Sequence, residues 1–396
     1  MRRKCLPALF MTLSFLIWAQ TPESSPANAF YNRGKAYYAQ KAYAQAIAEF
    51  TEALGLNPAY IEAVQGRGNA YGAIGDYDRA IADFTEALRI NPAYTAAWYN
   101  RGVAYSKKDD YDRAIADFTE ALRINPAYTA ALHGRGIGLF RKGDYDRGIA
   151  DFSEALNINP QFFPALISRG DAYRHKGDYA KALADYTEAI RQSPKASDAL
   201  YGRGLVYISK EDYTQGIADF TAALRYNPAL AAAFMNRGLA YVYRNEHDRA
   251  IADFAEGLRL SPAYLSTAPE GPQLISAYSV AFYNRGLACF NQKDYHQAIT
   301  HYTEAIRLNP GYIAALNNRG LAYRHTGDYD RAIADYDEAL RLNPEFADGF
   351  NNRGYVYYMQ GDCDRAIADY DEALRLNPEH PFAEENRRLA AARKQR

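Results

Sequence analysis

The sequence predicts an all-α solenoid of antiparallel helical hairpins. Prolines recur every 34 residues, the apolar residues between them follow helical spacing, and a short polar break divides the repeats. A period of this length is typical of stacked repeats, because one unit is too small to bury its own apolar face. The step is interrupted once, by 14 extra residues, after the seventh repeat. The repeat-closing prolines are Pro58, Pro92, Pro126, Pro160, Pro194, Pro228, Pro262, Pro310, Pro344 and Pro378.

The third repeat, residues 95–128, shows the two helices of one unit. Apolar and small residues recur at helical spacing from Ala97 to Tyr105 and again from Tyr111 to Leu122. Polar residues 108–110 separate the two runs, and the Asn-Pro pair at 125–126 ends the second helix. Elsewhere the break reads Gly-Asp, where glycine suits a left-handed residue closing the first helix and aspartate caps the second. These breaks lie at residues 75–76, 143–144, 177–178, 327–328 and 361–362.

Small residues occupy two places of every repeat, counted from its first residue. The eighth place is always glycine, as in Gly102, and the twentieth is always alanine or glycine, as in Ala114. Glycine within a helix costs about 1 kcal/mol relative to alanine, so its recurrence predicts close approach of neighbouring helices there. We expect large residues such as Phe84, Phe118 and Phe152 to fill the remaining space.

Arginine always precedes that glycine, at the seventh place, and an acidic residue follows sixteen residues later in nine repeats. This spacing predicts a structural ladder of partly buried ion pairs, which specifies register more than it adds stability. The arginines are Arg33, Arg67, Arg101, Arg135, Arg169, Arg203, Arg237, Arg285, Arg319 and Arg353. The acids are Glu49, Asp83, Asp117, Asp151, Asp185, Asp219, Asp253, Asp335 and Asp369, and only His301 breaks the series.

The pattern Trp98, Gly102, Tyr105, Ala114, Phe118, Ala121 and Pro126 resembles the tetratricopeptide repeat (TPR), and ten copies of it cover residues 27–380. The seventh-place arginine departs from the leucine that the family favours. The resemblance implies a right-handed superhelix whose first helices line a concave groove through places two, five, six, nine, twelve and thirteen. Places two and five never hold lysine or arginine, which argues against the carboxylate clamp of TPR co-chaperones.

Two of the implied groove places carry the candidate peptide-binding residues. Asparagine at the sixth place resembles the asparagine ladder in the repeat superhelix of O-linked N-acetylglucosamine transferases, and an amide can both donate to and accept from a peptide backbone. The alternative is that asparagine is simply part of an Asn-Arg-Gly sequence that many of the repeats share and has no role in binding. Four repeats lack it and have Gly66, Gly134, Ser168 or Gly202 at this place. Rigid, amphipathic tyrosines at the fifth place are further contact candidates. The candidates are Asn32, Asn100, Asn236, Asn284, Asn318 and Asn352 with Tyr31, Tyr99, Tyr201 and Tyr283.

The two ends and the interruption complete the organisation. Basic residues 2–4, an apolar run to Ala19 and a polar linker at 20–26 predict an export signal over 1–19, or an uncleaved N-terminal anchor. Repeats 1–7 span 27–264 and repeats 8–10 span 279–380. The insert at 265–278 predicts a surface loop or a hinge, with Pro272 in the first turn of a lengthened helix. Residues 381–396 predict a capping helix, because Arg388 replaces the stacking glycine.

Charge and chemistry point to a protein partner. There are 46 Lys and Arg residues against 47 Asp and Glu, so neither nucleic acid nor an anionic membrane surface is an expected partner. No metal, phosphate-loop or nucleophile motif occurs, which predicts a non-enzymatic protein without a cofactor. We therefore expect an exported, bacterial periplasmic or envelope scaffold that binds an extended peptide or partner segment in its groove. The alternative is a self-assembling structural subunit of an envelope complex.

Overall fold

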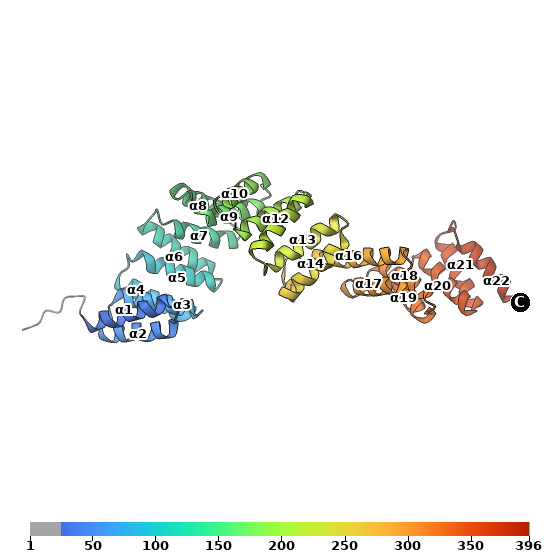
Figure 1. The fold of residues 1–396 in the computed structure, drawn as a ribbon, viewed down its shortest axis with the longest axis horizontal. Coiled ribbons are helices and arrows are strands. Elements are labelled where there is room, and N and C mark those ends of the chain that lie inside the picture. Colours follow the sequence, from blue (N-terminus) through green and yellow to red (C-terminus); the bar gives the residue numbers. More distant parts are fainter. Residues whose placement is uncertain (1–24, 396) are drawn as a thin grey trace, which may run out of the picture. The chain divides into compact units, whose positions relative to one another are not determined.

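A computed structural model describes residues 25–395, which form helices and contain no strand (Figure 1). The all-α solenoid of antiparallel hairpins is confirmed. In order, the helices are α1 Pro26–Ala39, α2 Tyr43–Leu56, α3 Ile61–Ala73, α4 Tyr77–Ile90, α5 Thr95–Lys107, α6 Tyr111–Ile124, α7 Thr129–Arg141, α8 Tyr145–Ile158, α9 Phe163–His175, α10 Tyr179–Gln192, α11 Ser197–Ser209, α12 Tyr213–Tyr226, α13 Ala231–Tyr243, α14 His247–Leu260, α15 Tyr264–Thr267, α16 Gly271–Asn291, α17 Tyr295–Leu308, α18 Ile313–His325, α19 Tyr329–Leu342, α20 Ala347–Gln360, α21 Cys363–Leu376 and α22 Ala383–Lys394.

The chain forms two compact units that divide after Lys176, inside the fifth repeat. The first unit contains α1–α9 and the second contains α10–α22. Within each unit every helix packs on the next, and each first helix of a hairpin also touches the first helix of the following repeat. The contact between the first helices of neighbouring repeats joins the hairpins of each unit into a continuous stack, as the repeat period predicts.

The breaks between the two helices of a repeat behave as predicted. Gly75 has a φ of +81°, and the Asp76 carboxylate accepts the backbone N–H of Arg79 at 3.1 Å. The other four Gly-Asp breaks have the same conformation and the same cap. Where glycine is absent, the chain still takes φ values of 57–62° at non-glycine residues such as Asp109, which strains the backbone mildly.

Glycine at the eighth place makes room for a large ring at the twenty-fourth. A Cβ added to Gly102 would lie 2.9 Å from Cε1 of Phe118, and the Phe118 side chain is 1% exposed. Burying such a ring contributes about 1.5–3 kcal/mol relative to leaving it in water, which outweighs the helix-propensity cost of the glycine. The predicted close approach is confirmed.

The arginine ladder is also confirmed, and most of its arginines join three helices rather than two. Arg101 on α5 donates from Nε and Nη2 to both oxygens of Asp117 on α6, each at 2.8 Å. Its Nη1 donates to Thr85 Oγ1 on α4, in the preceding repeat, at 3.0 Å. The same pair of bonds to the aspartate is made by Arg67, Arg135, Arg203, Arg237, Arg319 and Arg353. At the His301 break, Arg285 pairs instead with Asp248 of the preceding repeat at 3.0 Å.

The insert does not form a surface loop, so that interpretation is wrong. Residues 264–267 form α15, and α16 begins at Gly271 with Pro272 in its first turn. Leu274 and Tyr278 of the insert are buried in one core cluster with Met235 and Phe254 of the seventh repeat. The extra residues therefore lengthen a helix and supply the apolar side chains that a short loop would leave out.

The described structure begins just before α1 and ends just after α22. The predicted signal or anchor at 1–19 and most of the linker lie outside residues 25–395, where Ser25 caps α1. None of the described helices is both long and apolar enough to cross a membrane. At the other end α22 packs on α20 and α21, and the Arg388 side chain pairs with Glu384 on its exposed face.

Candidate peptide-binding surface

The fifth-place tyrosines lie half-buried on the first helices. The Tyr99 ring on α5 lies 5.8 Å from the buried Phe118 ring and 5.0 Å from that of Tyr128, measured between centroids. Tyr31, Tyr201 and Tyr283 cover the corresponding ring of their own repeats at 5.8–5.9 Å. Burial raises the pKa of Tyr99 above 10, so its hydroxyl stays protonated at neutral pH. Each tyrosine thus packs with one face and leaves part of its surface to solvent.

The sixth-place asparagines fall into two groups. Asn32 and Asn284 make no side-chain hydrogen bond with any other described residue. The other four donate from Nδ2 to the preceding repeat. Asn100 reaches Asn69 Oδ1 at 3.1 Å, and Asn236 reaches the Tyr201 hydroxyl at 3.2 Å. Asn236 is only 5% exposed and also donates to the Ala232 carbonyl, so it presents the least to a ligand.

In the second unit these bonds join into a continuous chain of side-chain amides, which we call the amide chain. Each link runs from a donor Nδ2 to an acceptor oxygen. Links from the sixth place of one repeat to the fifth place of the repeat before alternate with links from the fifth to the sixth place within a repeat. The five links are Asn386 to Asn351 at 3.0 Å, Asn351 to Asn352 at 3.4 Å, Asn352 to Asn317 at 3.0 Å, Asn317 to Asn318 at 3.2 Å and Asn318 to the Tyr283 hydroxyl at 3.1 Å.

Sequence reasoning found Asn318, Asn352 and Tyr283 but missed Asn317 and Asn351, which complete the chain. The signal was present, because only repeats 9 and 10 have asparagine at both the fifth and the sixth place. Each side-chain amide has two N–H groups and two carbonyl lone pairs, and each link uses one N–H group of the donor and one lone pair of the acceptor. The amide chain therefore holds its side chains in place. Asn351 is only 7% exposed, so the spare donors and acceptors that a ligand can reach are those of the half-buried Asn317, Asn318 and Asn352.

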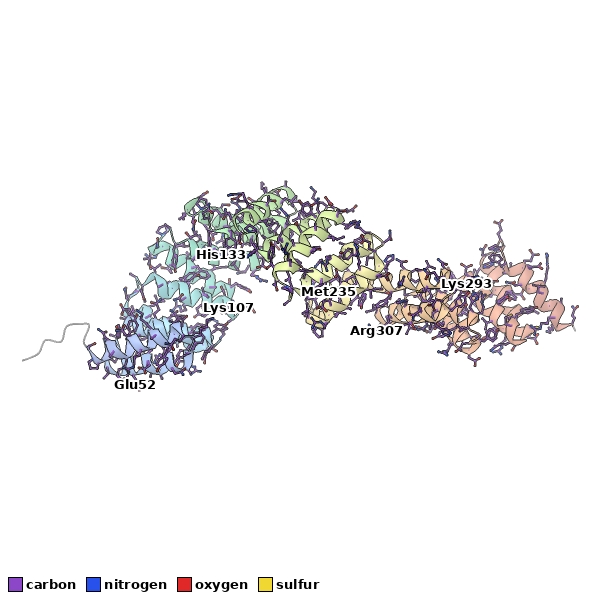
Figure 2. The ribbon with its side chains drawn as sticks, viewed as in Figure 1. Glu52, Lys107, His133, Met235, Lys293 and Arg307 are labelled. Carbon is purple, nitrogen blue, oxygen red and sulfur yellow. The ribbon has the colours of Figure 1, made fainter. Side chains whose placement is uncertain are left out.

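The first unit has hollows in place of an amide chain. One, of about 330 Å³, is lined by Tyr31, Phe50 and Gly66, and a second, of about 390 Å³, by Tyr99, Phe118 and Gly134. The two sites are equivalent, each formed by places five and twenty-four of one repeat and place six of the next. His133 and Lys107, both labelled in Figure 2, line the second hollow, and the His133 ring shares a 2.9 Å hydrogen bond with Ser168 Oγ.

Within the described residues no three His, Cys, Asp or Glu side chains are grouped as metal ligands. The arrangement in each unit is suited to binding, since the fifth and sixth places of its first helices carry amides, hydroxyls and aromatic rings.

Comparison with known proteins supports the repeat assignment along most of the chain. Family models described as "Tetratricopeptide repeat" match residues 27–60, 95–128, 201–264, 279–312, 301–334 and 347–380. A model described as "TPR repeat" matches residues 68–109, 170–210 and 320–361. No curated protein matches the sequence.

Solved structures with a similar fold include three repeat proteins. The crystal structure of MamA protein is 24% identical and has a TM-score of 0.40, over 43% of this chain and 92% of that one. YrrB, titled a TPR protein with an unusual peptide-binding site, is 23% identical with a TM-score of 0.39, over 46% and 95%. The P58(IPK) TPR domain is 18% identical with a TM-score of 0.34, over 94% and 99%. The family matches, which together span well over half of the sequence, show that the chain belongs to the tetratricopeptide-repeat family, whose fold typically serves as a non-catalytic protein–protein interaction scaffold.

Proposed function

We propose that this scaffold binds an extended segment of a partner protein along the first helices of its repeats, and that the amide chain recognises the backbone of that segment. The amide chain is the single observation that carries the proposal. A polar line that is already hydrogen-bonded loses little side-chain entropy when a ligand binds. Its spare donors and acceptors match the alternating N–H and C=O groups of an extended strand.

The spacing of the repeats fits such a ligand. Neighbouring helices lie about 8–10 Å apart, and an extended chain rises about 3.3 Å per residue. Each repeat would therefore contact about three ligand residues. Backbone recognition tolerates many side chains, so we expect a preference for extended, proline-poor segments and little preference for one sequence.

A peptide-library selection followed by backbone methylation tests this proposal. A displayed library of random dodecapeptides is selected on residues 25–396, and the enriched peptides are remade with N-methyl groups on alternate amides. We expect methylation to weaken binding about tenfold or more, because each lost bond to an amide costs about 1 kcal/mol. Single alanine substitutions in the peptide should cost less.

Asparagine variants locate the site. Asn352→Ala removes two links of the amide chain, whereas Asn157→Ala removes one exposed bond to Glu154 on the second helix α8. We expect Asn352→Ala, and more so the triple change at Asn284, Asn318 and Asn352, to weaken peptide binding at an unchanged folded fraction, with Asn157→Ala as the control. Unaltered affinity of the triple variant would refute backbone recognition by these amides. Concentration-dependent growth of the particle in light scattering, without peptide binding, would favour the self-assembling subunit.

We also propose that residues 1–19 direct export, on the basis of their charged, apolar and polar order. N-terminal sequencing of the protein from cell fractions checks this. A start near residue 20 in an exported fraction is expected, and an intact Met1 in the cytosol would contradict it.

A further inference from the structure

We infer that the two hollows of the first unit take two large apolar side chains of one acidic, extended partner segment. The inference rests on the proposed binding of extended segments, and it adds the chemistry of the partner. It concerns α1–α7 and therefore a part of the molecule separate from the amide chain.

At each hollow the sixth place of the following repeat is glycine. A Cβ added to Gly66 or to Gly134 would lie 2.7 Å from Cζ of Phe50 or of Phe118. Any larger side chain would cover the ring that forms the floor.

The floors of the hollows are aromatic, and their walls mix aromatic rings with polar side chains such as Asn69 in the first and Ser106 in the second. Phe50 and Phe118 form the floors, and the fifth-place tyrosines form one wall of each. Volumes of this size lie at the lower end of ordinary ligand pockets, which suits one large side chain each rather than a free small molecule. An aromatic or branched aliphatic side chain gains most from such a site.

The rims carry cations that have no carboxylate partner. Lys35 lies at the first hollow, and Lys107 and Arg141 at the second. Among residues 25–395 none of the three forms an ion pair, although most arginines of the second helices do. Two acids line the same hollows: Glu62 lies at the first together with Lys35, and Asp109 lies at the second and accepts the Tyr111 hydroxyl at 2.5 Å. The excess of positive charge is therefore at the second hollow, where Lys107 and Arg141 outnumber Asp109, and it favours a ligand that brings a carboxylate there.

The hollows are two repeats apart, which sets the spacing of the ligand. Two helix layers correspond to about 20 Å, or about six residues of extended chain. The expected occupant is therefore a segment with two large apolar residues about six positions apart and Asp or Glu between them.

A defined peptide tests the inference on the whole chain. The probe is a fluorescein-labelled peptide with phenylalanines at positions i and i+6 and alternating Glu and Ser elsewhere, measured by fluorescence polarisation. Comparison peptides have the phenylalanines at i and i+3, or Lys in place of every Glu. We expect the first peptide to bind at least tenfold more tightly than either comparison.

Two variants with matched controls assign the binding to the hollows. The double change Gly66→Asn and Gly134→Asn introduces a side chain that the solenoid already holds at this place in Asn100, and should reduce binding about tenfold or more. Gly202→Asn makes the same substitution outside the hollows, against the Tyr186 ring, and controls for stability. Reversing the charges of Lys107 and Arg141 should reduce binding about tenfold at low salt, whereas Lys195→Glu with Lys210→Glu should not.

The outcomes separate this inference from the proposed function. If the hollow variants bind the probe as the unchanged protein does while Asn352→Ala still loses its library peptides, the hollows are not side-chain sites and the proposed function stands. If the i+3 peptide or the Lys peptide binds as well as the probe, the stated partner chemistry is wrong.

Discussion

The Asp117 carboxylate is buried and accepts two hydrogen bonds from Arg101. Burial raises the pKa of Asp117, and the bonds to it raise the pKa of Arg101, so the ladder depends on keeping the two charges together. We expect Asp117→Asn to destabilise the fold by about 3 kcal/mol, because it leaves a buried guanidinium facing an amide N–H₂ group. Urea unfolding followed by circular dichroism measures the loss.

The control for this prediction is Asp112→Asn. Asp112 is mostly exposed and pairs with Lys142 of the next repeat, so its replacement should cost less than about 1 kcal/mol. Peptide affinity per folded molecule should be the same in both variants. A loss of affinity by Asp117→Asn without a loss of stability would assign the arginine ladder to the binding site instead.

His133 makes the first unit sensitive to acid. Burial lowers its pKa from 6.5 to about 4, so the folded protein favours the neutral ring. Between those two pH values the unfolded chain binds more protons, and stability must fall as the pH falls through that window. We expect His133→Tyr, which installs the residue that other repeats have at the fifth place, to reduce the drop in melting temperature between pH 7.5 and pH 5. An equal drop in both proteins would show that the other histidines or carboxylates cause it.

At the scale of helices, the two helices of a repeat can approach closely because the eighth-place residue has no Cβ. A Cβ on Gly136 would lie 2.5 Å from Cε1 of Phe152, whereas a Cβ on Gly55 of α2 would meet nothing within 4 Å. Gly136→Ala should therefore destabilise the protein by about 1–3 kcal/mol despite the better helix propensity of alanine. Gly55→Ala should stabilise it by up to about 1 kcal/mol. Thermal melts of the two variants should move in opposite directions, and a shared direction would contradict the packing role of the eighth place.

Most of this element-level organisation could be predicted from the sequence, since it repeats locally. Gly75 with Asp76 identifies a turn, and Gly102 with Phe118 identifies a contact, because the same pairs recur at fixed spacing. The insert could not be read this way. Its Leu274 and Tyr278 pack against the seventh repeat, and only the three-dimensional contact shows that they belong to the core.

The candidate surface was predictable in composition but not in connectivity. Asn318 and Asn352 were identified as groove residues from their place in the repeat. Their hydrogen bonds to Tyr283 and Asn317 in the preceding repeat depend on side-chain rotamers and on the helix-to-helix distance. The repeat period in the sequence gives neither the rotamers nor the helix-to-helix distance. The two hollows depend on the same two quantities, so they could not be predicted either.

At the scale of the whole molecule, the described helices of each unit pack only on helices of their own or the neighbouring repeat, so the stability of a unit is the sum of repeat terms and nearest-neighbour interfaces. Eight of the ten ladder arginines donate to a hydroxyl or carboxylate at the twenty-fifth place of the repeat before them; Arg33 has no repeat before it, and Arg285 pairs with Asp248 instead. Within a unit, the interface between one pair of neighbouring repeats can thus replace the interface between another pair, to a first approximation.

This interchangeability predicts that one complete repeat can be removed. Deleting residues 313–346 would bring Arg353 to Thr303, which accepts from Arg319 at 3.0 Å in the intact chain. It would also bring Asn352 to the Tyr283 hydroxyl, in place of Asn318. We expect this variant to keep the mean-residue ellipticity and the cooperative melt of the full chain, and to bind library peptides more weakly because its amide chain is shorter.

The matched control deletes half a repeat, residues 330–346. That change removes the second helix of the ninth repeat, so the Gly320 face loses the Tyr336 ring that covers it. Limited proteolysis should then cut within α18 and α20, whereas the variant without the whole repeat should resist. If both deletions lose helicity to the same extent, the repeats of the second unit are not interchangeable, and its stability depends on contacts peculiar to the ninth repeat.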